Sequence, residues 1–329
     1  MTSRRQVVIA LGAGALTASL PSLAQQANRA SARIGFLSGL APTEAREFIN
    51  CFLRGLKGSG WVEGHNTSID FRFGGGSSDQ HPALADELIR LRPDLIVVTS
   101  TTATQAVHRA TSTIPVVMIG VSNPVASGIV ASLARPGGNV TGVSNFLPAT
   151  SGKLLELLKM ASPRVSRVGV LYNPSNLGKV LEMAELRAAA NDIGVAIEPL
   201  EVRSSSDFEG AFLRITESRC DALVVLHEAV TFAVRSRIVE FAKTRRLATA
   251  FQIREYVEVG GLMSYGLNYC DHYRSAATYV DKILRGARPA DLPIQLPTTF
   301  ELTVNRNTAK AIGITIPKEL LLRADEVIG

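Results

Sequence analysis

Cysteine is scarce in this 329-residue chain, which contains three, and tryptophan occurs once. Cys51, Cys220 and Cys270 are odd in number and far apart, so they form no CxxC-type spacing for a metal. We therefore predict no metal site and expect the cysteines to be small buried apolar groups. One disulfide is compatible with this pattern if the chain enters an oxidising compartment.

The sequence also lacks the motifs of several enzyme classes. Its five histidines show no HxxxH or HExxH spacing, and no GxSxG nucleophile motif occurs. The run Gly74-Gly75-Gly76 is not followed by the Lys-Ser/Thr pair of a phosphate loop, so a flexible loop is the better interpretation. We predict no catalytic residue and no cofactor.

Charged residues make up only 19% of the chain, and the net charge of +6 is spread along the sequence. This distribution does not indicate a nucleic-acid surface. The apolar content of 46% predicts a well-packed globular protein, and the length favours two domains.

The first 24 residues have the composition of a secretory signal. Arg4 and Arg5 precede an apolar run, Val7–Leu20, and small residues then lead to Ala24. The run is too short for a stable membrane anchor. We predict export to the periplasm through this signal, residues 1–24, with cleavage after Ala24. Its paired arginines resemble a twin-arginine signal, and the general export route is the alternative.

From residue 33 onward, short apolar runs alternate with helical patterns. This alternation predicts an α/β fold with parallel sheets covered by helices, in two halves that meet near residues 146–151. The expected strands are Ile34–Leu37, Ser68–Phe73, Asp94–Val98, Pro115–Ile119, Val140–Val143, Val168–Tyr172, Val195–Leu200, Ala222–Leu226, Gly261–Tyr265 and Thr299–Val304. The expected helices are Glu44–Lys57, Pro82–Leu91, Thr102–Arg109, Gly152–Met160, Leu177–Asn191, Asp207–Ser218, Phe232–Thr244 and His272–Arg285.

The last part of the chain predicts that both domains are discontinuous. The late strands are separated by a single helix, so we expect the chain to pass between the domains more than once. The first lobe is predicted to comprise residues 33–146 and 267–298. The second is predicted to comprise residues 147–266 and 299–329.

Polar residues gather where the expected strands end. Ligands of open α/β sheets bind at the carboxyl ends of the strands, close to helix N-termini. Each of these residues could equally be a helix cap, a loop residue or part of the core between the lobes. The candidate ligand-binding residues are Ser38, Ser100, Thr101, Thr102, Ser122, Asn123, Asn145, Tyr172, Asn173, Glu228 and Tyr265.

Four long segments resemble one protein family. They are Ala134–Gly142, Gly260–Gly266, Tyr279–Ala287 and Arg323–Val327. With them, nearly all of the chain after residue 33 is similar to the substrate-binding proteins of ABC transporters often labelled tryptophan/tyrosine transport. The resemblance implies a type I periplasmic-binding fold, in which three hinge strands join two Rossmann-like lobes with parallel sheets.

The resemblance also suggests roles for individual residues. Thr101 matches a hydroxyl at the start of a helix, a candidate for carboxylate binding. Glu228 stands where relatives commonly have Asp, and it could pair with an ammonium group. Asn123 stands where Asp is usual, so any role that needs a negative charge there is lost.

These observations predict a monomeric, extracytoplasmic solute-binding protein of an ABC importer. It would bind an amino acid or a related carboxylate between its lobes by hinge closure, without chemistry, and deliver it to a permease in the inner membrane. An extracytoplasmic ligand sensor for a membrane receptor is the alternative. A sugar-repressor-like domain would need an N-terminal helix-turn-helix, where this chain has a signal segment.

Overall fold

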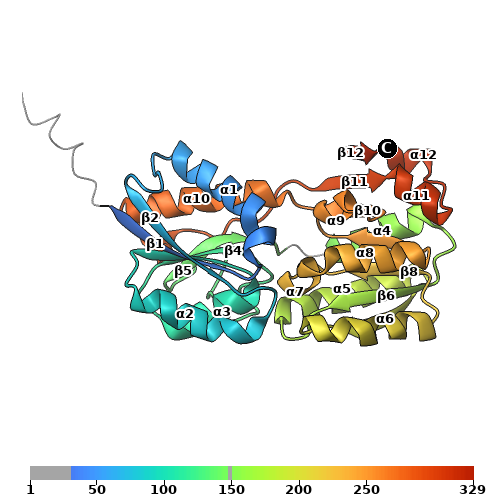
Figure 1. The fold of residues 1–329 in the computed structure, drawn as a ribbon, viewed down its shortest axis with the longest axis horizontal. Helices are drawn as coiled ribbons and strands as arrows, with labels where there is room; N and C mark the ends of the chain where they lie inside the picture. Colours follow the sequence, from blue (N-terminus) through green and yellow to red (C-terminus); the bar gives the residue numbers. More distant parts are fainter. Residues whose placement is uncertain (1–30, 147–149) are drawn as a thin grey trace, which may run out of the picture.

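The computed structural model describes residues 31–146 and 150–329, which form two lobes side by side (Figure 1). The predicted signal segment, residues 1–24 with cleavage after Ala24, lies outside the described residues. Each lobe is built on its own β-sheet.

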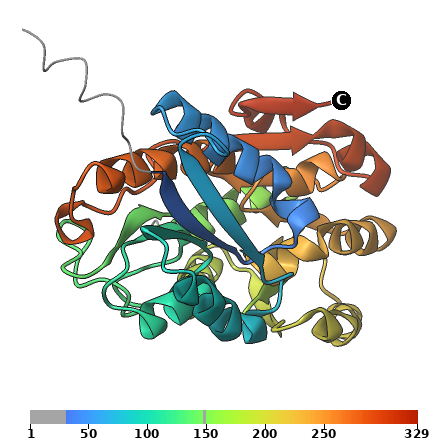
Figure 2. The ribbon, with the colours of Figure 1, turned by 60° about the vertical axis from the view of Figure 1, so that its left-hand side comes forward.

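The first lobe contains a parallel sheet with the strand order β2-β1-β3-β4-β5. Helices α1 and α10 pack together on one face of this sheet, and α2 and α3 lie on the other (Figure 2). The elements are β1 (Ala32–Ser38), α1 (Pro42–Gly58), β2 (Thr67–Phe73), α2 (His81–Arg90), β3 (Leu95–Thr99), α3 (Thr101–Ala110), β4 (Val116–Val121), β5 (Val140–Ser144) and α10 (Tyr269–Leu284).

The second lobe contains a sheet with the order β12-β11-β10-β9-β8-β6-β7. Helices α4 and α5 pack on one face, and α6 and α8 pack on the other. The strands are β6 (Arg167–Tyr172), β7 (Ala196–Glu201), β8 (Ala222–Val225), β9 (Ala248–Phe251), β10 (Met263–Gly266), β11 (Glu301–Asn305) and β12 (Glu326–Ile328). The helices are α4 (Thr150–Ala161), α5 (Leu177–Asp192), α6 (Phe208–Glu217), α7 (Ala229–Ala233), α8 (Arg235–Thr244), α9 (Glu255–Glu258), α11 (Arg306–Ile312) and α12 (Lys318–Leu321).

The chain passes between the lobes three times, after β5, after β10 and before β11. On the way back to the second lobe, residues 292–295 run beside edge strand β5, where Ser144 N–H donates to the Gln295 carbonyl at 2.9 Å. Strand β11 then joins the second sheet antiparallel to β10. The three crossings make each lobe from segments that are distant in sequence.

The predicted α/β fold with two Rossmann-like lobes is confirmed. The helix expected at Phe232–Thr244 is instead two helices, α7 and α8, because the backbone leaves helical geometry at Val234 (φ −112°, ψ 20°). Strand β9 was not predicted, since Ala-Thr-Ala-Phe is short and alanine has little preference for strands. Its place in the middle of the sheet makes it a strand.

Apolar packing continues from one lobe into the other. Phe48 on α1 lies 5.8 Å from Phe232 on α7, measured between ring centroids, and both belong to one cluster of buried side chains. The lobes therefore share part of their core in this arrangement. In the part of the chain that the structure describes, no helix is long and apolar enough to cross a bilayer.

Candidate functional site

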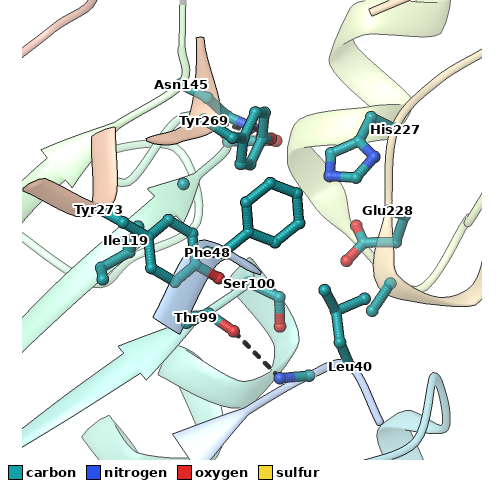
Figure 3. Close-up of a pocket in the computed structure, with 14 residues that line it drawn as sticks. Leu40, Phe48, Thr99, Ser100, Ile119, Asn145, His227, Glu228, Tyr269 and Tyr273 are labelled. Atoms are coloured by element: carbon teal, nitrogen blue, oxygen red, sulfur yellow. Dashed lines mark hydrogen bonds between the residues drawn. The ribbon is translucent and has the colours of Figure 1, made fainter. Parts of the chain in front are cut away.

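A cavity lies between the lobes, and both lobes line it (Figure 3). It opens at the carboxyl ends of β1, β3, β4 and β8, where parallel sheets bind ligands. The first lobe contributes Gly39, Leu40, Phe48, Thr99, Ser100, Ile119, Gly120, Ser122, Asn145, Tyr269 and Tyr273, and the second contributes His227, Glu228 and Ala229. We call this space the interlobe cavity.

The first-lobe wall contains the start of helix α3. Ser100 caps this helix, and its hydroxyl accepts a hydrogen bond from the Ala103 N–H at 3.4 Å. Its backbone has φ 74° and ψ 155°, a region that costs energy for a residue with a side chain. Such strain is common at ligand-binding sites. The unpaired N–H groups and positive dipole end of α3 suit a carboxylate.

The second-lobe wall contains a buried acid, Glu228, with 6% of its surface exposed. Its carboxylate accepts hydrogen bonds from the Asn176 side-chain amide and from the backbone N–H of Thr231. Burial raises the pKa of Glu228, while the charge of Lys179 and the bond from Asn176 oppose that shift. A cationic group in the cavity would favour the ionised carboxylate.

Aromatic rings close the cavity between these two polar walls. Tyr269 at the start of α10 meets the edge of the His227 ring from the other lobe, with centroids 4.8 Å apart. Phe48 stacks on Tyr273 at 5.4 Å. Asn145 holds Tyr269 in place by donating to its hydroxyl at 3.2 Å. A ligand here would have apolar rings on one side of its polar groups.

His227 is neutral in this setting. Its Nδ1 is buried and has no hydrogen-bond partner among the described residues. Burial lowers the pKa of His227 to about 3, and the charges of Lys179 and Arg235 contribute to the shift. The ring therefore acts as a neutral wall of the cavity over the physiological range.

A second, smaller cavity adjoins the first and shares Asn145 and Tyr269 with it. Lys179, which is 2% exposed, reaches into its wall and donates to Glu182 at 2.8 Å and to Gln252 at 3.2 Å. Gln252 also accepts from the His227 N–H at 2.7 Å. This network compensates a buried charge and fixes the loop that carries His227 and Glu228.

The structure brings some of the predicted site residues together. Ser100, Ser122, Asn145 and Glu228 line the interlobe cavity, and Tyr265 lines the adjoining one, where its ring lies 5.6 Å from that of Phe300.

The other candidates lie nearby and mostly make local hydrogen bonds. The Ser38 hydroxyl accepts from Leu40 N–H at 3.1 Å, and the Thr101 hydroxyl accepts from Ser122 N–H at 3.0 Å. Thr102 is half-buried in the first turn of α3.

The remaining three also bond locally. Asn123 adopts φ 44° and accepts from Ala126 N–H at 3.0 Å. Tyr172 donates to Glu201 at 3.1 Å, and Asn173 accepts from Ser175 N–H at 2.9 Å. In this arrangement none of these three side chains lines either cavity.

Sequence reasoning missed the aromatic part of the site. Phe48 lies within the helix expected at Glu44–Lys57, and Tyr269 precedes the helix expected to begin at His272; neither is among the candidate ligand-binding residues. The helix begins earlier because the Asn268 side chain caps it, accepting from Asp271 N–H at 3.3 Å. The signal was available: Asn268 followed by two tyrosines four residues apart predicts a capped helix with an aromatic face.

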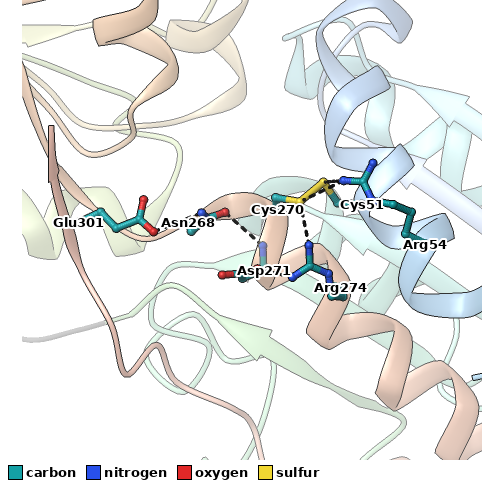
Figure 4. Close-up of a disulfide and its surroundings, with 7 residues drawn as sticks. All are labelled: Cys51, Arg54, Asn268, Cys270, Asp271, Arg274 and Glu301. Carbon is teal, nitrogen blue, oxygen red and sulfur yellow. Dashed lines mark hydrogen bonds and ion pairs between the residues drawn. A yellow bond between two sulfur atoms is a disulfide. The ribbon is translucent and has the colours of Figure 1, made fainter. Parts of the chain in front are cut away.

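Cys51 and Cys270 form a disulfide that joins α1 to the start of α10 (Figure 4). The guanidinium of Arg54 donates to Cys51 Sγ at 2.9 Å. Cys220 is free and buried, as expected of a small apolar side chain. The disulfide thus connects the helices that carry Phe48 and Tyr269.

Within the described ranges, no group of three His, Cys, Asp or Glu side chains could hold a metal ion.

Comparison with known proteins extends this picture. Residues 37–328 match the protein family described as ABC transporter substrate binding protein. A tyrosine-binding protein of Clostridioides difficile (strain R20291) is 27% identical over 263 residues, which cover 80% of this chain and 75% of that protein.

Two solved structures are similar over most of the chain. An ABC domain from Streptococcus pneumonia in complex with L-Trp has 28% identity and a TM-score of 0.85, covering 91% of this chain and 100% of that one. The ligand-free, open structure of a substrate binding protein from Clostridium difficile has 26% identity and a TM-score of 0.64, covering 90% and 99%.

We expect His227 to make the protein less stable in acid. The unfolded chain binds a proton near the usual pKa of 6.5, whereas the folded imidazole stays neutral down to about pH 3. Stability from this group is therefore lost as the pH falls below 6.5, by roughly 1–3 kcal/mol between about pH 6.5 and 4.5. His227→Gln should lose less unfolding free energy over this interval, measured by urea unfolding.

His65→Gln, at an exposed position, is the matched control and should behave as the wild type. Equal acid sensitivity in the wild type and His227→Gln would contradict the prediction.

Removal of the disulfide should destabilise the protein. The bond closes a loop of 219 residues, and native disulfides contribute roughly 2–5 kcal/mol. The double variant Cys51→Ala, Cys270→Ala should show a lower guanidinium chloride midpoint than the wild type without reductant. Reductant should lower the unfolding midpoint of the wild type and leave that of the double variant unchanged. A wild-type midpoint that is the same with and without reductant would disprove the bond.

Proposed function

This chain belongs to the ABC transporter substrate-binding protein family, and on that premise we propose that it binds an amino acid or a related carboxylate for an ABC importer. In this role it works as a monomer outside the cytoplasm and delivers its ligand to a permease of the inner membrane. The predicted signal at residues 1–24 is consistent with that location. The bound molecule is held and released unchanged.

One observation supports this ligand class: across the interlobe cavity, a wall that suits a negative group faces a wall that suits a positive group. The start of α3, with Ser100, favours a carboxylate. Glu228 on the second lobe favours an ammonium group, since in the part of the chain that the structure describes its buried carboxylate has neutral hydrogen-bond donors alone in direct contact. An amino-acid zwitterion carries both groups on one carbon atom.

The aromatic lining supports an aromatic or other large apolar side chain. Phe48, Tyr269, Tyr273 and His227 surround the space between the polar walls. The relatives bind ligands of this kind, tyrosine in one and L-Trp in the other. Tryptophan and tyrosine are therefore the first ligands to test.

The arrangement of the lobes supports hinge closure as the binding mechanism. The structure matches the tryptophan-bound relative more closely than the ligand-free, open one, although both are about equally similar in sequence. The lobes thus resemble those of a ligand-bound protein. Ligand would bind to one open lobe, and the second lobe would then close over it.

A thermal-shift screen of residues 25–329 tests the ligand class. The panel contains the common amino acids, their deaminated acids, nucleosides and sugars. A ligand at 100 times its dissociation constant adds about 2.7 kcal/mol to the folded state. We expect an aromatic amino acid to give the largest rise in Tm. A shift with sugars or nucleosides alone would disprove the proposed ligand class.

Replacement of Glu228 tests the ammonium contact. Glu228→Gln keeps the size and hydrogen-bonding oxygen of the side chain but removes its charge. Affinity for the amino acid should fall by about 1–3 kcal/mol, or roughly 5- to 150-fold, in isothermal titration calorimetry.

Two comparisons isolate the charge effect. Glu217→Gln, at an exposed position on α6, should bind like the wild type. The deaminated analogue of the same amino acid should bind Glu228→Gln at least as well as it binds the wild type. If the variant loses equal affinity for both ligands, the ammonium contact is wrong.

A further inference from the structure

At one side of the interlobe cavity, the backbones of the two lobes approach so closely that only glycine fits. Gly178 is the second residue of α5 in the second lobe. A Cβ atom on it would lie 2.3 Å from Ser122 Cβ and 2.6 Å from the Ser122 carbonyl oxygen of the first lobe. Backbone atoms cannot move aside as a flexible side chain can, so a methyl group here requires the lobes to separate.

A second glycine contact lies where helix α7 meets the first lobe. A Cβ on Gly39 would lie 3.3 Å from Ala229 Cβ, and one on Gly76 would lie 3.1 Å from Ala233 Cβ. Gly76 also has φ 85°, which favours glycine by itself. Small residues therefore face each other at this contact, as in other close backbone approaches.

Both contacts border the proposed ligand site. Ser122, Gly39 and Ala229 line the interlobe cavity. The same segment of the second lobe connects them, because Asn176 caps α5 with a bond from Gly178 N–H at 3.0 Å and donates its amide to Glu228. The position of α5 against Ser122 thus sets where the Glu228 carboxylate stands relative to the first-lobe wall.

We infer that Gly178, together with Gly39 and Gly76 where they face α7, positions the lobes for closure. These glycines allow the lobes to come together and bring Glu228 opposite Ser100. This inference rests on the proposed closure around a ligand. A methyl group at Gly178 holds the lobes apart without touching the ligand, so it lowers affinity through the conformational equilibrium.

Gly178→Ala is a suitable test because each lobe tolerates it. The position is helical with no positive φ, alanine favours helices, and the bond to Asn176 uses the backbone N–H, which is retained. Gly210→Ala is the matched control, since Gly210 lies in the first turn of α6 with no atom within 4 Å of its added Cβ. Circular dichroism and Tm verify that both variants fold.

The lobe separation is measured by electron–electron double resonance between spin labels at exposed Thr43 and Ser205, one on each lobe, in a Cys220→Ala background. Each protein is measured in three samples: without ligand, with L-tryptophan, and with L-tyrosine. We expect the wild type and Gly210→Ala to reach a short distance that Gly178→Ala does not reach. Affinity of Gly178→Ala for the amino acid should fall by about tenfold or more.

The wild type and the variant answer separate questions. A wild type whose spin-label distance responds to neither L-tryptophan nor L-tyrosine contradicts the proposed function. If that distance is short in every wild-type sample and longer in Gly178→Ala, the glycine inference still stands. If Gly178→Ala reaches the same short distance as the wild type, or if the wild type never reaches it, the glycine inference is overturned.

Discussion

The meeting of two sheet edges is the constraint on which the rest of this structure depends. Parallel strands bring their carboxyl ends to one edge, and loops and helix N-termini follow there. The three crossings turn that edge of one sheet toward that of the other (Figure 1). Each wall of the interlobe cavity is therefore an ordinary strand-to-helix connection. The proposed binding site depends on the second wall facing the first.

Burial makes the polar groups of these walls selective. An unpaired charge in a closed space is costly. The two buried charged side chains of the second lobe, Lys179 and Glu228, differ in how their charge is compensated. Lys179 is paired with Glu182 and Gln252, and its network serves as support. Glu228 has neutral donors in direct contact, and among the described residues no cationic side chain forms an ion pair with it, although the charge of Lys179 acts on it from nearby. In the proposed function, the ammonium group of a ligand supplies that partner.

The proposed closure combines apolar attraction with a hard steric limit. Contacts such as Phe48 with Phe232 bury surface when the lobes meet, which favours the closed arrangement. The approach of Gly178 to Ser122 decides how far they can go. Because packed backbones do not deform continuously, a single methyl group changes the available positions of a whole lobe.

Much of this fold follows from the sequence alone, because strands and helices each place apolar residues at a characteristic spacing along the chain. Alternation of apolar runs and helical faces predicts the two α/β lobes, and the end of each strand predicts where Ser100 and Glu228 lie. The pairing of Cys51 with Cys270, the contact of Tyr269 with His227 and the fit of Gly178 were decided by tertiary structure. Each joins residues far apart in the chain, and no local pattern records which distant segments the crossings bring together.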